Sequence, residues 1–406
     1  MEKLYIVGFG PGDEKLWTEK SRNIISNADR ILSTNRISLS LADNKNVQNC
    51  KNCTLSELTA ELASKIQGIT VVLVSGDCGF FSVSKNIMRD FSEQYDIELI
   101  NGISSIQYFS AKIAVSYDDA VICSMHGRNN ILGIVPKSAY NKKVFALTGG
   151  KFKAHDICGV LYNSGLPDIK VIVGERLSYP DEKITEGTAG ELKDKIFDDL
   201  SVMCIENDSF KNPHQPLNDE DFIRGDIPMT KAETRWLSIQ KLGIQPTDIV
   251  YDIGAGTGSV SVEMARKAFD GFVYAIEMKE EACDLMNQNK VKHGAYNLEI
   301  IHAKAPDGIN DLPKPDKVFI GGSSGNMPEI LEALIIKNPS LKIVSNAITL
   351  QSISQIIEGY EKIGLVDTDI ICVNIAKSKK IQKYDMMTAQ NPVYIITGQG
   401  EGECIY

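Results

Sequence analysis

Short apolar runs alternate with amphipathic stretches along most of the chain. Residues 16–26 and 55–66 have apolar positions three and four apart, which is typical of helices that bury one face. Strands that alternate with helices predict an α/β architecture. In the first half, the strand-like runs are residues 4–7, 70–74, 98–100, 121–123, 144–147, 170–173 and 202–205.

The alternation stops and restarts near the middle of the chain. Residues 207–221 are polar and contain Pro213 and Pro216, a composition typical of linkers. We therefore expect a domain boundary near residue 211, with domains at 1–210 and 211–406. A helix at 231–242 then precedes strand-like runs at 249–252, 272–276, 298–302, 317–320, 342–346, 369–374 and 392–397. Helices fit between the first five runs and the last two should pair antiparallel, which predicts a doubly wound sheet.

Composition and charge narrow the class of protein. The chain has 406 residues, so two halves can each bury a core. Its net charge is −10. An acidic chain has no overall field that attracts nucleic acid or an anionic membrane, and we expect neither as a partner. No apolar run approaches the ~18 residues of a membrane span. The first residues lack the pattern of a signal peptide, so we expect a cytoplasmic protein.

The nine cysteines are scattered and odd in number, which indicates reduced thiols. Cys50 and Cys53 form a lone CxxC pair. A zinc site would normally need a second pair or spaced histidines, so we expect no metal.

A glycine-rich turn after the run at 249–252 is the strongest local signal. It reads Gly254-Ala255-Gly256-Thr257-Gly258 and leads into a predicted helix. Glycines allow close approach of the backbone to a ligand, and the helix offers free N–H groups. Glu277 ends the next strand, where a carboxylate can accept ribose hydroxyls. The spacing resembles motif I of Rossmann-like methyltransferases, which implies S-adenosylmethionine as the cofactor; a tight turn in another α/β protein is the alternative.

Further motifs in the second half narrow the resemblance. Residues 225–235, 304–306, 319–325 and 386–393 together resemble the C15-methylating, decarboxylating domain of the precorrin-6Y or cobalt-precorrin methyltransferases. The resemblance covers about residues 222–400. It implies that Thr230, residues 254–258, Glu277 and Ala305 contact the cofactor. Lys304 stands where that family usually has an acidic residue.

Three loops of small residues follow predicted strands of the first half, at residues 7–13, 74–81 and 101–107. Open α/β sheets bind ligands at this end of their strands. The loops resemble the tetrapyrrole methylase family over about residues 3–205, and residues 124–128 and 173–182 point to its C5-methylating branch. Cys78 and Asn101 each replace a usual proline. The resemblance implies a second cofactor site lined by Pro11, Gly76, Asp77, Phe80, Ser104, Ser105 and Thr148.

The order of the two halves resembles the fused precorrin-6Y C5,15-methyltransferases (decarboxylating). The resemblance implies a tetrapyrrole methylase fold followed by a Rossmann-like, class I methyltransferase fold. It implies a homo-oligomeric enzyme of cobalamin biosynthesis that methylates C5 and C15 of precorrin-6Y, precorrin-6B or a cobalt-precorrin and decarboxylates the C12 acetate. Methyl transfer from a sulfonium needs alignment rather than a covalent nucleophile, so no catalytic triad is expected.

Such a tetrapyrrole carries many carboxylates, which cations would bind, preferably arginine. Glu263 is expected to orient the cofactor loop or to cap its helix. His126 is a candidate for contacting substrate or moving a proton, or is a hydrogen-bonded structural histidine. The candidate cations are Arg128, Arg176, Arg224, Arg235 and the cluster Lys377, Lys379, Lys380 and Lys383. The lysine cluster could equally be a solvated loop, and Arg235 a surface residue.

Two other functions stay open at this point. Motif I also occurs in RNA methyltransferases, but an RNA target would predict a basic surface with aromatic stacking residues. A non-catalytic protein that binds S-adenosylmethionine is the second alternative.

Overall fold

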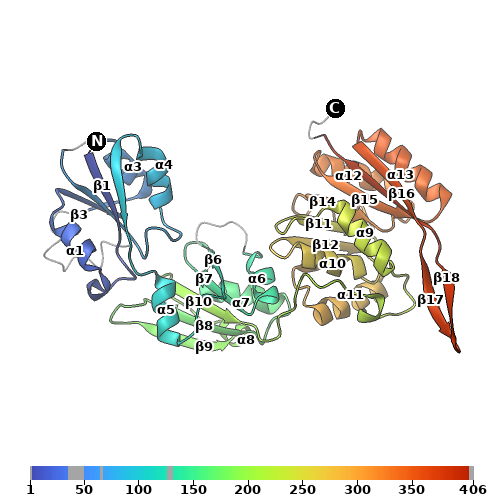
Figure 1. Cartoon of the computed structure of the whole chain (residues 1–406), viewed down its shortest axis with the longest axis horizontal. Coiled ribbons are helices and arrows are strands. Elements are labelled where there is room, and N and C mark those ends of the chain that lie inside the picture. Colours follow the sequence, from blue (N-terminus) through green and yellow to red (C-terminus); the bar gives the residue numbers. More distant parts are fainter. Residues whose placement is uncertain (1, 35–49, 65–66, 126–130, 402–406) are drawn as a thin grey trace. The chain divides into compact units, whose positions relative to one another are not determined.

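The computed structural model describes residues 2–34, 50–64, 67–125 and 131–401 (Figure 1). Contacts divide the chain into two compact units. The first contains residues 1–131, 143–159 and 168–206, and the second contains residues 132–142, 160–167 and 207–406. A boundary between domains near residue 211 stays a prediction.

The first sheet of unit 1 is parallel throughout, with strand order β3-β2-β4-β1-β5. The central strand β4 is buried at all five positions, as expected when helices cover both faces of a parallel sheet. Its strands are β1 (Glu2–Gly8), β2 (Arg30–Thr34), β3 (Cys50–Cys53), β4 (Thr70–Val74) and β5 (Tyr95–Ile100). Its helices are α1 (Glu19–Ser26), α3 (Leu55–Ala63) and α4 (Ser84–Phe91).

The predicted helix at 16–26 is shorter in the structure. Glu14–Leu16 forms the 3-10 turn η1, and α1 begins only at Glu19. The reason is Thr18, which has an extended backbone and whose Oγ1 accepts the backbone N–H of Ser21 at 3.1 Å. The first N–H groups of a helix have no carbonyl partner within it, and the Thr18 hydroxyl accepts one of them, so the helix begins after Thr18.

The second sheet of unit 1 is mixed, with order β6-β7-β10-β8-β9. Only β6 and β7 are parallel; the other pairs are antiparallel. Its strands are β6 (Val121–Ser124), β7 (Lys143–Leu147), β8 (Lys170–Glu175), β9 (Lys183–Thr188) and β10 (Ser201–Glu206). The helices in this part of the sequence are α5 (Ser105–Ile113), α6 (Ile134–Tyr140), α7 (Ala154–Asn163) and α8 (Ala189–Leu192), of which α6 and the end of α7, residues 160–163, belong to unit 2.

Unit 2 contains the predicted doubly wound sheet, with order β13-β12-β11-β14-β15-β19-β16. The first five of these pair in parallel, and β19 runs antiparallel to β15 and β16, as the sequence predicts. Its strands are β11 (Ile249–Ile253), β12 (Phe272–Glu277), β13 (Leu298–His302), β14 (Lys317–Ile320), β15 (Lys342–Ala347), β16 (Val366–Val373) and β19 (Val393–Gln399).

Helices cover both faces of this sheet (Figure 1). Side chains of α12 (Met327–Lys337) and α13 (Leu350–Lys362) pack on one face, beside Tyr251 and Ile253. Side chains of α9 (Ala232–Leu242), α10 (Ser259–Lys267) and α11 (Glu280–His293) pack on the other, beside Val250. A short 3-10 turn, η3 (Asp219–Asp221), precedes α9. None of the helices in the described ranges has the length and apolarity needed to cross a membrane.

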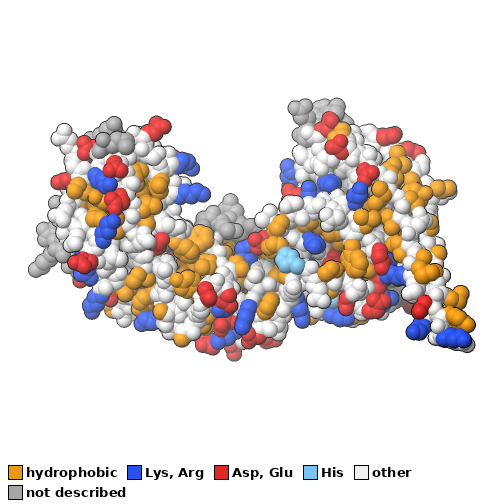
Figure 2. All heavy atoms as spheres, viewed as in Figure 1, with side chains coloured by type: hydrophobic (Ala, Val, Ile, Leu, Met, Phe, Trp, Pro, Cys, Tyr) orange, Lys and Arg blue, Asp and Glu red, His pale blue; other side chains and the backbone are white. Residues whose placement is uncertain are grey.

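A two-stranded ribbon holds the lysine cluster that sequence reasoning treated as a loop or a substrate rim. Its strands are β17 (Ala376–Ile381) and β18 (Tyr384–Ala389), which pair antiparallel and are exposed at every residue. Apolar and basic side chains gather on it, at the lower right of Figure 2. With both faces in solvent, the ribbon has no apolar–polar alternation that would have predicted it.

Candidate active sites

A cavity of about 720 Å³ opens in unit 2 where the loops after β11, β12, β14 and β15 meet. The strand order reverses between β11 and β14, and open α/β sheets bind ligands at such a point. The predicted cofactor residues that line it are Thr230, Gly254, Ala255, Gly256, Thr257, Glu277 and Ala305. Seven of the eight predicted positions of this half therefore surround one cavity.

The glycine turn after β11 requires its glycines for different reasons. Gly254 has a φ of +68°, and a Cβ there would lie 2.4 Å from the carbonyl oxygen of Gly322, so only glycine lets the two loops meet. A Cβ at Gly258 would lie 2.3 Å from Cγ of Met286. Gly258 thus packs against α11 and is the N-cap of α10. The sequence predicted that it contacts the cofactor, but it does not line the cavity.

Glu277 ends β12 and its carboxylate fixes three backbone amides. Oε2 accepts the N–H of Gly256 at 2.9 Å, and Oε1 accepts those of Met278 and Lys279, each at 2.9 Å. A carboxylate has about four acceptor sites, so at least one remains for a ligand. Glu277 therefore holds the glycine turn in place and still faces the cavity.

Asp252 is a cavity residue that the sequence reasoning missed. Its side chain is fully buried, and its Oδ2 accepts a hydrogen bond from the hydroxyl of Ser261. No described residue donates to its Oδ1. Burial raises the pKa of Asp252 to about 7. An acidic residue inside an otherwise apolar run, directly before the glycine turn, was the signal that could have identified it.

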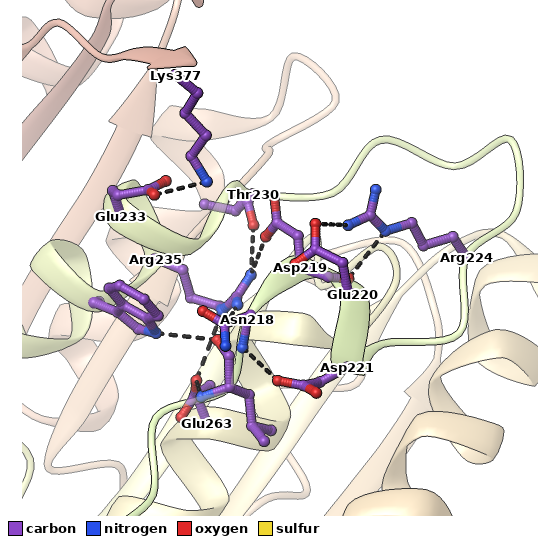
Figure 3. Close-up of polar contacts among 12 residues, drawn as sticks. Asn218, Asp219, Glu220, Asp221, Arg224, Thr230, Glu233, Arg235, Glu263 and Lys377 are labelled. Carbon is purple, nitrogen blue, oxygen red and sulfur yellow. Dashed lines mark hydrogen bonds and ion pairs between the residues drawn. The ribbon is translucent and has the colours of Figure 1, made fainter. Parts of the chain in front are cut away.

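Arg235 is completely buried, so the predictions that it binds substrate or lies on the surface are wrong. Figure 3 shows its guanidinium among carbonyl and carboxylate oxygens. Nη1 donates to the carbonyl of Thr230 at 2.8 Å, and Nη2 to that of Leu217 at 2.7 Å. Ion pairs join it to Asp219 at 3.3 Å and to Glu263 at 3.9 Å. Because Thr230 lines the cavity, Arg235 acts on the site through the backbone that it holds.

Glu263 has neither of its two predicted roles. Its Oε1 accepts the backbone N–H of Leu217 at 2.9 Å, and the carboxylate also pairs with Arg266 at 3.8 Å. Asn289 of α11 bonds both the backbone of Ile223 and the carbonyl of Thr257, at 2.8 to 3.1 Å. These contacts tie the segment before α9 to the helices behind the glycine turn.

The other predicted cations of unit 2 do not line the cavity. Arg224 is partly exposed, donates to the carbonyl of Asp219 at 3.0 Å and pairs with Glu220 at 3.8 Å. Lys377 pairs with Glu233 at 2.6 Å (Figure 3). The lysines that do line the cavity are Lys231, Lys279 and Lys304, and sequence reasoning proposed none of them as a substrate contact.

A second cavity, of about 360 Å³, lies in unit 1 and is lined by all seven predicted residues of that half, from Pro11 to Thr148. Gly76, which lines this cavity, takes part in a contact of glycine backbones at the ends of β1, β4 and β5. A Cβ at Gly102 would lie 2.4 Å from the carbonyl oxygen of Gly76 and 2.5 Å from that of Gly8. Asp77 secures this contact, since its Oδ2 accepts the N–H of Gly102 at 3.2 Å.

The predicted residues of unit 1 differ in what they contact. Ser104 caps α5, accepting the N–H of Gln107 at 3.1 Å, and Thr148 donates to the carbonyl of Ser201 at 2.8 Å. Arg176 pairs with Asp181 at 2.5 Å and does not line the cavity. His126 and Arg128 lie outside the described residues.

Two protein-family models match the chain, and they match consecutive parts of it. Residues 3–193 match the tetrapyrrole (corrin/porphyrin) methylases, and residues 221–398 match the precorrin methyltransferase domain. These matches confirm the predicted order of the two α/β folds.

Individual relatives agree with the family matches. A Pyrobaculum calidifontis protein named probable cobalt-precorrin-6B C(15)-methyltransferase (decarboxylating) is 38% identical over 184 residues, which cover 45% of this chain and 94% of the relative. A Sinorhizobium protein named precorrin-6Y C(5,15)-methyltransferase [decarboxylating] is 26% identical over 349 residues, covering 84% of this chain and 82% of the relative. A solved structure of a Geobacter metallireducens precorrin-6y C5,15-methyltransferase is 37% identical, with a TM-score of 0.44, and the match covers 46% of this chain and 96% of that one.

Proposed function

The chain belongs to the precorrin methyltransferase family, and we propose that it is a bifunctional, S-adenosylmethionine-dependent enzyme of cobalamin biosynthesis. It methylates C5 and C15 of precorrin-6Y, precorrin-6B or the corresponding cobalt-precorrin, and it decarboxylates the C12 acetate side chain. The observation that carries this proposal is the presence of two cavities, one at the strand ends of each unit, lined by the residues that the two resemblances single out. Domains at 1–210 and 211–406 are part of the proposal.

The cavity of unit 2 fits S-adenosylmethionine through its two buried carboxylates. Asp252 has an oxygen without a donor among the described residues, which suits the α-amino group of the methionine part. Glu277 keeps acceptor capacity for the ribose hydroxyls, and the turn at Gly254 lets the backbone approach closely. The Asp252 carboxylate is favoured when a cation binds beside it.

The cavity of unit 1 supports a second cofactor site of different construction. Its glycine contact places backbone groups at the strand ends, and Asp77 holds this contact in shape. Ser104, Ser105 and Thr148 add hydroxyl groups to the wall. Hydroxyls can donate or accept, so this wall suits the polar ends of the cofactor.

Bound S-adenosylmethionine supplies a methyl group on a positively charged sulfur. The protein has to hold an electron-rich carbon of the macrocycle in line with that methyl, and alignment of two reactants can contribute roughly 7–11 kcal/mol. For decarboxylation, the residues around the cavity hold the acetate where it loses solvation, and the macrocycle accepts the electrons as carbon dioxide leaves. A proton then replaces the lost carboxyl group on the side-chain carbon. Neither step calls for a covalent protein nucleophile.

We also propose that the enzyme is cytoplasmic and forms a homo-oligomer. The ribbon of β17 and β18 supports self-association, because Tyr384, Met386 and Met387 are more than half exposed on it (Figure 2). Large apolar side chains gathered on a surface commonly mark an interface. Light scattering of the purified chain tests this: a mass equal to one chain would contradict it.

Titration with S-adenosylhomocysteine tests the two-site proposal directly. We expect the full chain to bind two molecules, Glu277→Gln to weaken one site, and Asp77→Asn to weaken the other. A stoichiometry of one, removed entirely by either substitution alone, would contradict the proposal of two separate sites.

A further inference from the structure

Three lysines line the cavity of unit 2, and their ammonium groups bind no other group in the described part of the chain. Lys231, Lys279 and Lys304 are all exposed. Within the described ranges, none of their ammonium groups forms an ion pair or a hydrogen bond; the neighbouring Lys377, by contrast, is paired with Glu233. The chain as a whole is acidic, so three unpaired cations at one cavity need a reason.

Two of these lysines occupy positions that helix physics disfavours. Lys231 is the N-cap of α9 and Lys279 the N-cap of α11, and neither side chain accepts a capping hydrogen bond. Ser, Thr, Asp and Asn are preferred there because their oxygens accept free N–H groups, as Thr54 and Ser104 do elsewhere in this chain. The positive end of the helix dipole also repels a lysine. Neither lysine therefore stabilises the start of its helix, which leaves its charge available to a ligand of the cavity.

Negative and positive side chains of the cavity differ in their exposure to solvent. The buried carboxylates of Asp252 and Glu277 lie inside, and the three exposed lysines are in solvent. Buried acids favour a cationic ligand, while exposed cations favour an anionic one. One cavity therefore offers opposite charges to two ligands.

We propose that Lys231, Lys279 and Lys304 bind the carboxylates of the tetrapyrrole and so place the macrocycle against the cofactor. This inference rests on the proposed function, because it takes its anionic ligand from there. Sites for one small molecule measure roughly 300–1,000 Å³, so a cavity of about 720 Å³ that contains the cofactor leaves the macrocycle at the opening, beside these lysines. Contacts in solvent are individually weak and are screened by salt.

The substitutions Lys231→Ser, Lys279→Ser and Lys304→Gln test this assignment in the full chain. Each should raise KM for the corrin substrate by about threefold, and the triple variant by at least about tenfold at low salt. KM for S-adenosylmethionine should change less than about twofold. The two serine variants should also melt at a higher temperature than the wild type, because serine caps a helix and lysine does not.

Lys292→Ser is the matched control. Lys292 is an exposed lysine at the other end of α11 and does not line the cavity. Its replacement by serine removes one positive charge, as each of the three single substitutions does. It should leave both KM values unchanged. An equal rise of KM for the corrin in the control, or an unchanged KM in the triple variant, would overturn the assignment. Equal weakening of corrin and cofactor binding would also overturn it, since that result indicates a structural role.

A binding measurement separates this inference from the proposed function. Uroporphyrin, a stable tetrapyrrole octacarboxylate, can be titrated onto each variant and followed by absorbance. Weaker binding to each single variant than to Lys292→Ser, which removes the same charge, supports the lysine assignment even if the wild type methylates no corrin, in which case only the proposed function fails. Equal binding to the triple variant and the wild type overturns the assignment even if the wild type is fully active.

Discussion

Replacing Arg235 with methionine removes the cation from the buried network before α9 while keeping most of the side-chain volume. The substitution leaves the buried carboxylate of Asp219 without its ion-pair partner, whereas Glu263 loses one of two arginines and keeps Arg266 at 3.8 Å. Breaking one side of a buried ion pair costs about 3–5 kcal/mol. The carbonyl of Leu217 retains a donor, since Nε1 of Trp236 lies 3.2 Å from it, so the loss falls mainly on the Asp219 carboxylate and on the carbonyl of Thr230. We expect unit 2 to lose about 3–5 kcal/mol of unfolding free energy.

Trp236 makes this loss measurable in the full chain. The chain has two tryptophans, Trp17 and Trp236, so Trp17→Phe leaves a fluorescence reporter within the network itself. Arg224→Met is the matched control, because its pair with exposed Glu220 should contribute less than about 1 kcal/mol. Urea unfolding of both variants in the Trp17→Phe background gives the comparison. If Arg235→Met loses no more stability than Arg224→Met, the buried network does not hold this segment and our reasoning fails.

Three further predictions concern the two cavities. Burial raises the pKa of Asp252 from 3.8 to about 7, so between these pH values the folded chain holds a proton that the unfolded chain has released. Stability without ligand should therefore fall as pH increases from about 4 to 7 and level off above about 7, while affinity for S-adenosylmethionine should rise up to about pH 7 and then level off. Asp252→Asn should flatten both curves in calorimetry. Glu277→Gln should weaken binding of S-adenosylmethionine at least about tenfold, since it weakens three backbone bonds and the ribose contact, and an unchanged dissociation constant would contradict this. Gly102→Ala should abolish C5 methylation and spare C15 methylation, because its Cβ would lie 2.4 Å from the carbonyl oxygen of Gly76. The control Gly159→Ala should spare both methylations, because the space around that position is open. The mass of the product distinguishes these outcomes.

The sheet of unit 2 could be predicted because buried parallel strands appear as apolar runs. Strands β11 to β15 all lie close to the predicted ranges. Strands β3 and β9 were missed because they are polar strands at sheet edges, and β3 has only its last residue, Cys53, buried. The inner strand β2 was missed as well, because its buried apolar run is only the pair Ile31 and Leu32 between polar residues. A pattern method detects a strand through its buried side chains, and edge strands have few of these.

The candidate sites were predictable where a motif follows a strand, and less so where charges meet across elements. Residues such as Gly254 and Asp77 stand directly after strands, so their place at a cavity follows from the sheet. The burial of Arg235 depends on Asp219 and Glu263, which arrive from other elements. Lys231 and Lys279 become informative only once the structure identifies them as N-caps beside a cavity.

The mass of the product is the most direct test of the two-site account. The purified full chain should be incubated with S-adenosylmethionine and precorrin-6B or its cobalt form. We predict a gain of two methyl groups and the loss of one carbon dioxide. One methyl gained with carbon dioxide lost would contradict a methyl-transfer role for the cavity of unit 1. No change in mass with either corrin, by a protein that binds S-adenosylmethionine, would contradict the proposed substrate.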